Sequence, residues 1–227
     1  MSRNLTIAGA LVALFLILVA VVAIAGGSAD DESPAQRTAA TTTTATGSTP
    51  ARVITPDPRR LGEAGSTGVT FTEFLDFECE ACRAAFPAIE ELRRKYAGRV
   101  TFNIRYFPIP SHQNSRNAAV AVEAAFQQGR LEQMYVRMFE TQEEWGEQSD
   151  SKAGLFREFA DDLGLDLKRY DAAVADPKTL QRVERDFAAG ATLGVRGTPT
   201  FFIGEERVDA QSIDDLRNAI DEAVRGT

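Results

Sequence analysis

Two cysteines separated by two residues, Cys79 and Cys82, are the side chains of this sequence best suited to chemistry. They are the only cysteines among the 227 residues, and the stretch that carries them reads EFLDFECEACRAAFP. A Cys-x-x-Cys pair can be a redox-active dithiol, half of a metal site, or a disulfide with a purely structural role. The residues around the pair favour the first of these.

The structural and metal interpretations both fit poorly. A disulfide between Cys79 and Cys82 closes a very short loop, so it removes little conformational entropy from the unfolded chain. A zinc site needs three or four ligands, and the chain has a single histidine, His112, to add to the two thiols and a carboxylate. Because His112 follows two prolines in FPIPSHQNS, we expect a loop or helix-entry residue there, not a ligand or a base. We expect no metal.

The dithiol interpretation agrees with the elements expected around it. Cys79 lies between an apolar, β-branched segment typical of a buried strand, residues 68–77, and a segment with helical spacing, residues 80–98. The free N–H groups and the dipole at a helix N-terminus stabilise a thiolate, which is the nucleophile of thiol–disulfide exchange. Cys82, one helical turn later, is placed to attack the mixed disulfide that Cys79 would form with a substrate.

The remaining elements predict an α/β domain. A second strand is expected at residues 99–110, followed by a long helical tract at about 114–193. Two short strands, 198–204 and 206–210, are joined by the turn at Gly204-Glu205, and residues 212–224 form an amphipathic final helix. This order gives a mixed sheet covered by helices, with the helical tract as an insertion. Breaks in the tract are expected at residues 127–130, 143–154, 164 and 176–179.

The N-terminal part predicts export to the outside of the membrane. Residues 5–25 contain no charge, and as a helix they would span roughly 30 Å, about the thickness of a bilayer core. Arg3 precedes the segment and acidic residues follow it, so residues 1–4 are expected in the cytoplasm and the rest outside. We expect an uncleaved single-pass anchor; the alternative is a signal peptide cleaved after Ala25. Residues 26–62, rich in Thr, Ala and Pro, are expected to be a flexible linker to a domain at 63–227.

The charge of the chain excludes one class of partner. The formal net charge is −8, and the sequence has no run of basic residues. Proteins that bind nucleic acids usually carry a basic patch to neutralise phosphates. We therefore expect no nucleic-acid partner.

From Thr67 to Val224 the sequence resembles the thioredoxin superfamily, and specifically its exported DsbA-type branch. Besides Cys-x-x-Cys, Glu73 lies where the family keeps a buried acid, and Pro87 lies at the position of the proline that kinks the active-site helix. The segment GVRGTPTFFIG is similar to the family's cis-proline loop, with Thr198 before Pro199. The segment RYFPIPSHQNSRNAAVAVEAA is similar to the entry into the helical insertion of membrane-linked, actinobacterial DsbA-like proteins.

The resemblance implies a thioredoxin-like fold and a set of roles. The Cys79–Cys82 disulfide would be the redox centre, with no other cofactor. The backbone of Thr198, beside a cis Pro199, would pair with the substrate peptide. Glu73 would exchange a proton with Cys82 through water, and its burial would raise its pKa. The implied activity is oxidation of thiols in secreted proteins, with reoxidation by a membrane partner of the DsbB or vitamin K epoxide reductase type.

One departure leaves the direction of the reaction open. Strongly oxidising members of the family carry Pro and His between the cysteines, whereas this chain has Glu80 and Ala81, preceded by Asp76 and Glu78. Negative charge near Cys79 would raise its pKa and make the disulfide less oxidising, while the helix N-terminus acts in the opposite sense. The alternatives are a reductase, for example in cytochrome c maturation, and a non-catalytic peptide-binding or chaperone module on the same scaffold.

Overall fold

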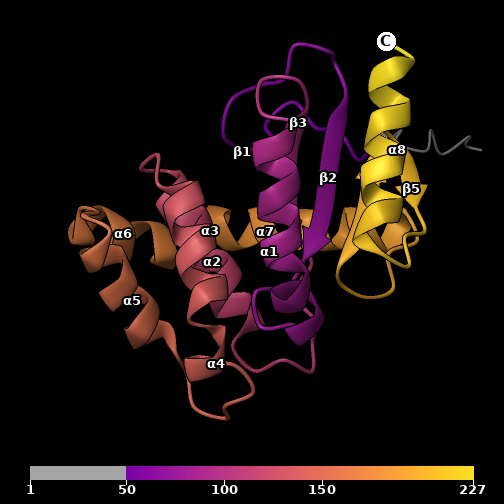
Figure 1. Cartoon of the computed structure of the whole chain (residues 1–227). Helices are drawn as coiled ribbons and strands as arrows, with labels where there is room; N and C mark the ends of the chain where they lie inside the picture. The colour runs from indigo at the N-terminus through magenta and orange to yellow at the C-terminus, as the bar shows by residue number, and fades with distance from the viewer. Residues whose placement is uncertain (1–49) are drawn as a thin grey trace, which may run out of the picture. The chain divides into compact units, whose positions relative to one another are not determined.

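Five short strands form one mixed sheet in the computed structural model, which describes residues 50–227 (Figure 1). They are β1 (Arg59–Leu61), β2 (Thr70–Leu75), β3 (Thr101–Tyr106), β4 (Thr200–Ile203) and β5 (Glu206–Val208), in the spatial order β1-β3-β2-β4-β5. The central pair, β2 and β3, is parallel, and the other three pairs are antiparallel. A parallel pair requires a crossover connection, which is α1 (Glu80–Lys95).

Helices cover both faces of the sheet, because side chains alternate between the faces along each strand. Phe71 and Leu75 of β2 belong to the larger buried cluster, which includes residues of α1 and of α8 (Ile213–Arg225). Phe74 faces the other way and packs in a smaller cluster with residues at the C-terminal end of α7 (Pro177–Thr192). Accordingly, α1 and α8 lie in front of the sheet in Figure 1 and α7 runs behind it.

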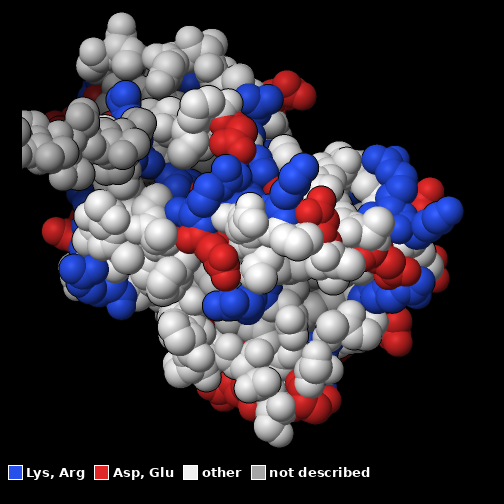
Figure 2. All heavy atoms as spheres, turned by 180° about the vertical axis from the view of Figure 1, so that it is seen from behind, with Lys and Arg blue, Asp and Glu red and all other residues white. Residues whose placement is uncertain are grey.

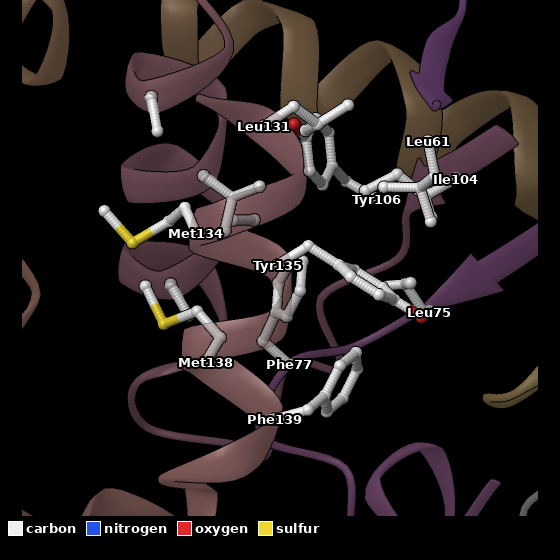
Figure 3. Close-up of a cluster of buried hydrophobic side chains, with 14 of the residues drawn as sticks. Leu61, Leu75, Phe77, Ile104, Tyr106, Leu131, Met134, Tyr135, Met138 and Phe139 are labelled. Atoms are coloured by element: carbon white, nitrogen blue, oxygen red, sulfur yellow. The ribbon is translucent and has the colours of Figure 1, made fainter. Parts of the chain in front are cut away.

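The helical insertion between β3 and β4 is present as expected. It consists of α7 and five preceding helices: α2 (Ser115–Phe126), α3 (Leu131–Glu140), α4 (Gln142–Trp145), α5 (Ala153–Asp162) and α6 (Leu167–Ala175). Figure 3 shows how it joins the sheet: Tyr135 and Phe139 of α3 lie on the side of the helix that faces Leu75 and Phe77, and Met134 and Met138 lie on its other side. Tyr135, Phe77 and Phe139 form an aromatic group with ring centroids 5.1–6.2 Å apart. The insertion and the sheet therefore share one core.

The expected boundary between linker and domain is wrong. Residues predicted to end a flexible linker at 62 include β1, which pairs antiparallel with β3. Earlier still, Val53 is buried in the cluster that contains Phe74. The contacts of Arg59 explain why the linker was predicted to extend to residue 62. The Arg59 guanidinium is buried against the Glu123 carboxylate with N–O distances of 2.6 Å. An arginine in a short polar segment gives no sign in the sequence of such a distant buried partner.

The other expected elements are found with shifted ends. The first two predicted strands are shorter than expected, because hydrogen bonding of β2 and β3 ends at Leu75 and Tyr106. Within residues 50–227, no helix is both long enough and apolar enough to cross a membrane. The predicted anchor at residues 5–25 lies outside the described residues, as does most of the predicted linker.

Candidate active site

The dithiol lies where β2 turns into α1. Cys79 is the N-cap residue of α1, with extended backbone angles (φ −71°, ψ 121°), and its carbonyl accepts the helical hydrogen bond from the Arg83 N–H at 3.1 Å. The N–H groups of the first turn have no helical acceptors, so those of Ala81 and Cys82 are free to point at the Cys79 sulfur. The strand-to-helix position predicted for Cys79 is correct.

The loop that contains Pro199 lies beside the dithiol, because the strand that follows it, β4, pairs with β2. Phe74 of β2 is in register with Thr200 of β4, which brings the preceding residues beside Cys79. The Thr198–Pro199 peptide bond is cis, as the resemblance implies. In its protonated form the Cys79 thiol donates to the Thr198 carbonyl, with Sγ and oxygen 3.3 Å apart. The three residues thus meet at one point, although their roles toward a substrate remain predictions.

The two sulfurs differ sharply in acidity. Both are free thiols, and Cys79 is 8 % exposed while Cys82 is 1 % exposed. A hydrogen bond from Cys82 is the main cause that lowers the pKa of Cys79 to about 5; burial opposes it, and the Thr198 side chain and the backbone N–H groups of Ala81 and Cys82 assist. Burial raises the pKa of Cys82 well above its usual value, and the hydrogen bond to Cys79 raises it further. Cys79 is therefore the thiolate at neutral pH, and Cys82 is the protonated donor.

Glu73 supplies a protonated carboxyl group to the same site. Its side chain lies on β2 and is 3 % exposed, so the expectation of burial is correct. Burial, together with the nearby charges of Cys79 and Glu90, raises the pKa of Glu73 to about 8. A neutral Glu73 does not oppose the Cys79 thiolate. Its proposed proton exchange with Cys82 remains a prediction.

The Asp76 carboxylate binds the loop after β3. Its buried carboxylate accepts backbone N–H groups from Glu78 and Ile109, each at 2.9 Å, and lies 2.7 Å from Nδ1 of His112. These contacts tie the loop after β3 to the turn before Cys79. His112 is in this loop, as expected. Among residues 50–227, no group of three or more His, Cys, Asp or Glu side chains is arranged to hold a metal ion.

Glu78, like Asp76, ties the turn before Cys79 to another segment, in this case the helical insertion. It is 2 % exposed, and its two carboxylate oxygens accept the backbone N–H groups of Asn114 at 2.6 Å and Glu147 at 3.0 Å. A carboxylate that accepts backbone donors is stabilised by them in its charged form. The acidic residues before Cys79 therefore anchor neighbouring segments, and the pKa of Cys79 is lowered despite them.

Gln142 of α4 is a site residue that the sequence did not reveal. Its amide nitrogen donates to the carbonyls of Phe77 at 2.6 Å and Cys79 at 3.0 Å, and the side chain is buried. Gln142 thereby fixes the turn that carries the dithiol. Neither its residue type nor its distance of 60 positions along the chain from Cys82 distinguishes it in the sequence.

Replacing Gln142 by leucine is expected to lower the free energy of unfolding by about 1–3 kcal/mol, because a similar-sized apolar side chain leaves the buried Phe77 carbonyl without its donor. Urea denaturation measures the change. Gln148→Leu is the matched control, since Gln148 donates to a carbonyl, that of Glu144, at the exposed surface. Equal losses in the two variants would contradict the assignment.

A mixed sheet with a Cys-x-x-Cys dithiol at the start of its first helix, facing a cis-proline loop, defines a thioredoxin-like protein. The family model described as Thioredoxin matches residues 55–222, so the chain belongs to the thioredoxin family.

Solved structures support the same conclusion. A thioredoxin-like oxidoreductase from Silicibacter pomeroyi DSS-3 is 25 % identical, with a TM-score of 0.62 over 74 % of this chain and 94 % of that chain. The thiol-disulfide exchange protein alpha-DsbA2 from Wolbachia pipientis is 25 % identical, with a TM-score of 0.60 over 73 % of this chain and 86 % of that one. BdbD from Bacillus subtilis shares the fold at 19 % identity, with a TM-score of 0.65 over 78 % of this chain and 100 % of that one. The DsbA-type resemblance is confirmed, and at a general level the neighbours support a disulfide oxidoreductase.

Curated relatives are longer proteins. The Na(+)/H(+) antiporter NhaA 3 of Salinispora tropica is 34 % identical over 155 residues, which are 68 % of this chain and 23 % of the antiporter. The antiporter NhaA of Herminiimonas arsenicoxydans is 33 % identical over 144 residues, which are 62 % of this chain and 21 % of that protein. The chain thus spans less than a quarter of the length of these two relatives.

Proposed function

We propose that the protein is a membrane-anchored, extracytoplasmic thiol–disulfide oxidoreductase that oxidises thiols of secreted proteins to disulfides. The observation that carries the proposal is the low pKa of Cys79, about 5, at a sulfur in contact with the cis-proline loop. The location outside the membrane rests on the apolar segment at residues 5–25.

The reaction begins with the Cys79–Cys82 disulfide. A substrate thiolate attacks the Cys79 sulfur, the bond between the two enzyme sulfurs breaks, and the electron pair leaves on Cys82. Because the pKa of Cys82 is far above neutral, this sulfur takes up a proton, and the buried Glu73 carboxyl, with a pKa of about 8, is the proposed donor through water.

A second substrate thiolate completes the transfer. It attacks the substrate sulfur of the mixed disulfide and expels Cys79, which leaves readily because its thiolate is stable at neutral pH. The substrate has then lost two electrons to form a disulfide, and the enzyme has gained two as the dithiol. A membrane oxidant, proposed to be of the DsbB or vitamin K epoxide reductase type, would accept those electrons and restore the enzyme disulfide.

The acidity of Cys79 supports oxidation over reduction. Only the reduced enzyme contains the thiolate, so a low pKa stabilises the reduced state and makes the disulfide a stronger oxidant. A pKa of about 5 in place of 9.0 stabilises the reduced form by roughly 2–3 kcal/mol at pH 7, equivalent to roughly 50–60 mV for a two-electron couple. The acidic residues that suggested a weak oxidant do not cancel this effect, since Asp76 and Glu78 accept backbone N–H groups elsewhere.

A Cys82→Ser variant is expected to trap covalent mixed disulfides with secreted proteins. Its Cys79 thiolate attacks a disulfide of the secreted protein and expels one substrate sulfur as a thiolate, and Cys82, which would otherwise attack the Cys79 sulfur of the adduct and release the enzyme, is absent. Non-reducing electrophoresis and mass spectrometry of the captured partners provide the measurement. Cys79→Ser is the matched control and should trap far less, because the remaining thiol is buried and protonated. Absence of adducts in both variants would favour the non-catalytic peptide-binding alternative. The reduction potential distinguishes the two directions, with a value nearer about −120 mV favouring an oxidase and one nearer about −270 mV a reductase.

A further inference from the structure

A cavity lies on the face of the sheet covered by α7, away from the dithiol. Its volume is about 820 Å³, and it is formed by the segment 50–57, Arg105 of β3 and one side of α7. Figure 2, which shows the molecule from behind, has Lys and Arg side chains gathered near the centre of this view. The charged lining consists of Arg52, Arg105, Arg182, Arg185, Asp57 and Asp186.

Two arginines and the two carboxylates form a rigid frame for the cavity. Arg105, Arg182 and Asp186 each have side chains at most 4 % exposed. One oxygen of Asp186 accepts from Arg105 at 2.7 Å, and the other accepts from Arg182 at 3.1 and 3.2 Å. Asp57 accepts from Arg182 at 2.6 Å. Both carboxylates are therefore already bound to buried guanidinium groups; of the two, Asp186 is itself buried and Asp57 is exposed.

Several donors at the cavity have no acceptor among residues 50–227. Arg105 uses Nε for Asp186 and Nη1 for the carbonyls of Arg52 and Val53, but its Nη2 donates to no group there. The hydroxyl of Thr55, which also lines the cavity, is buried without a partner. Arg185 is exposed and forms no ion pair within the described residues. A buried donor without an acceptor, here the Thr55 hydroxyl, is rare in folded proteins.

The lining is also positively charged. Four arginines face two carboxylates, although the whole chain has a net charge of −8. The effect is visible at Asp57: burial acts to raise its pKa, but the charges of Arg182, Arg59 and Arg185 hold it below the ordinary value. An anion that enters the cavity would meet the unused donors and a favourable potential together.

We propose that this cavity binds a phosphate group. A phosphate presents acceptor oxygens in several directions, which matches an unused guanidinium N–H, a hydroxyl and a flexible second arginine, and arginine is the residue that most often recognises phosphates. Two sources can supply the group: the headgroup of an anionic phospholipid, or a soluble phosphate ester. The segment 50–57 that lines the cavity follows residues 26–49, which connect in sequence to the predicted membrane anchor.

Isothermal titration of the full chain in detergent micelles with inorganic phosphate tests the proposal, with chloride at the same ionic strength as the reference titration. Saturable binding is expected for the unmodified protein. Arg185→Gln is expected to bind about tenfold more weakly, a loss of ~1.4 kcal/mol. Arg130→Gln removes the same charge from an exposed arginine outside the cavity lining and should leave the affinity unchanged. Absence of saturable binding, or equal weakening in both variants, would overturn the proposal.

The same titration in nanodiscs separates the two sources. If a lipid headgroup occupies the cavity, discs of phosphatidylglycerol will weaken binding of inorganic phosphate relative to discs of phosphatidylcholine, and Arg185→Gln will remove the difference. If the ligand is soluble, the affinity will be the same in both discs. Either result retains the phosphate site. Thiol–disulfide exchange by Arg185→Gln should equal that of the unmodified protein, because Arg185 does not contact the dithiol.

Discussion

Replacement of Cys79 by serine is expected to abolish thiol–disulfide exchange and to remove nearly all thiol reactivity at pH 7. With a pKa of about 5, roughly 99 % of Cys79 is thiolate at this pH, whereas Cys82, whose pKa lies above its ordinary 9.0, is at most roughly 1 % thiolate. Burial reduces the access to Cys82 still further, since it is 1 % exposed. Alkylation by iodoacetamide, with the modified residue identified by mass spectrometry, measures the effect. Cys82→Ser is the control and should remain reactive.

The pH profile of that alkylation gives a second, quantitative outcome. In the unmodified reduced protein the rate should rise through a midpoint near pH 5 and be constant by pH 7. A midpoint near 8 or 9 would show that the first turn of α1 and Cys82 do not stabilise the thiolate, and the argument for an oxidase would fail. The sign for stability follows from linkage: because folding lowers the pKa, the thiolate contribution is complete above pH 9 and is lost as the pH falls to about 5.

Replacement of Glu123 by alanine is expected to lower the free energy of unfolding by about 3–5 kcal/mol, the usual cost of removing one partner from a buried ion pair. Glu123 of α2 accepts two hydrogen bonds of 2.6 Å from Arg59 and one of 3.0 Å from the Tyr106 hydroxyl. Both side chains of the ion pair are at most 6 % exposed. The variant would leave the Arg59 charge buried beside Phe126 with only the exposed Asp57 carboxylate, 3.8 Å away, as a counter-charge.

Glu184→Ala is the matched control for this prediction. Glu184 pairs with Arg116 at 3.3 Å on the surface, where both side chains are more than half exposed. Loss of such a pair changes stability by less than about 1 kcal/mol. Urea denaturation of the two variants makes the comparison. A similar, small effect in both would mean that β1 is not held to the insertion through Arg59, and the domain would then begin nearer the boundary expected from the sequence.

The redox centre could be recognised from local signals alone. Cys79 lies between an apolar strand and a helical repeat, and this junction itself provides the N–H groups that stabilise a thiolate. The resemblance to the thioredoxin superfamily implied that Glu73 is buried, and alternation along β2 places it on the same face as Phe71 and Leu75. Such inferences succeed because the residues that decide them are within about ten positions of one another.

Contacts between distant segments could not be inferred in this way. The effect of Asp76 and Glu78 on Cys79 depends on which donors their oxygens reach, and those donors, at Ile109, Asn114 and Glu147, are more than 30 positions away. Counting charges along the sequence identifies Asp76 and Glu78 only as anions near the Cys79 thiol. The structure places them as acceptors for loops of the insertion, so the acidity of Cys79 is set by Cys82, Thr198 and the helix N-terminus.

The kind of chemistry and the order of the elements follow from the sequence alone, because residue types, the spacing of Cys79 and Cys82, and hydrophobic periodicity are properties of adjacent positions. The ionised thiol, the start of the domain and the support that Gln142 gives to the dithiol turn are known only from the folded structure. Each of these depends on burial and on hydrogen bonds between segments that are far apart in the chain. A buried hydrogen bond is strengthened in this way only when the packed core has excluded water from both its donor and its acceptor.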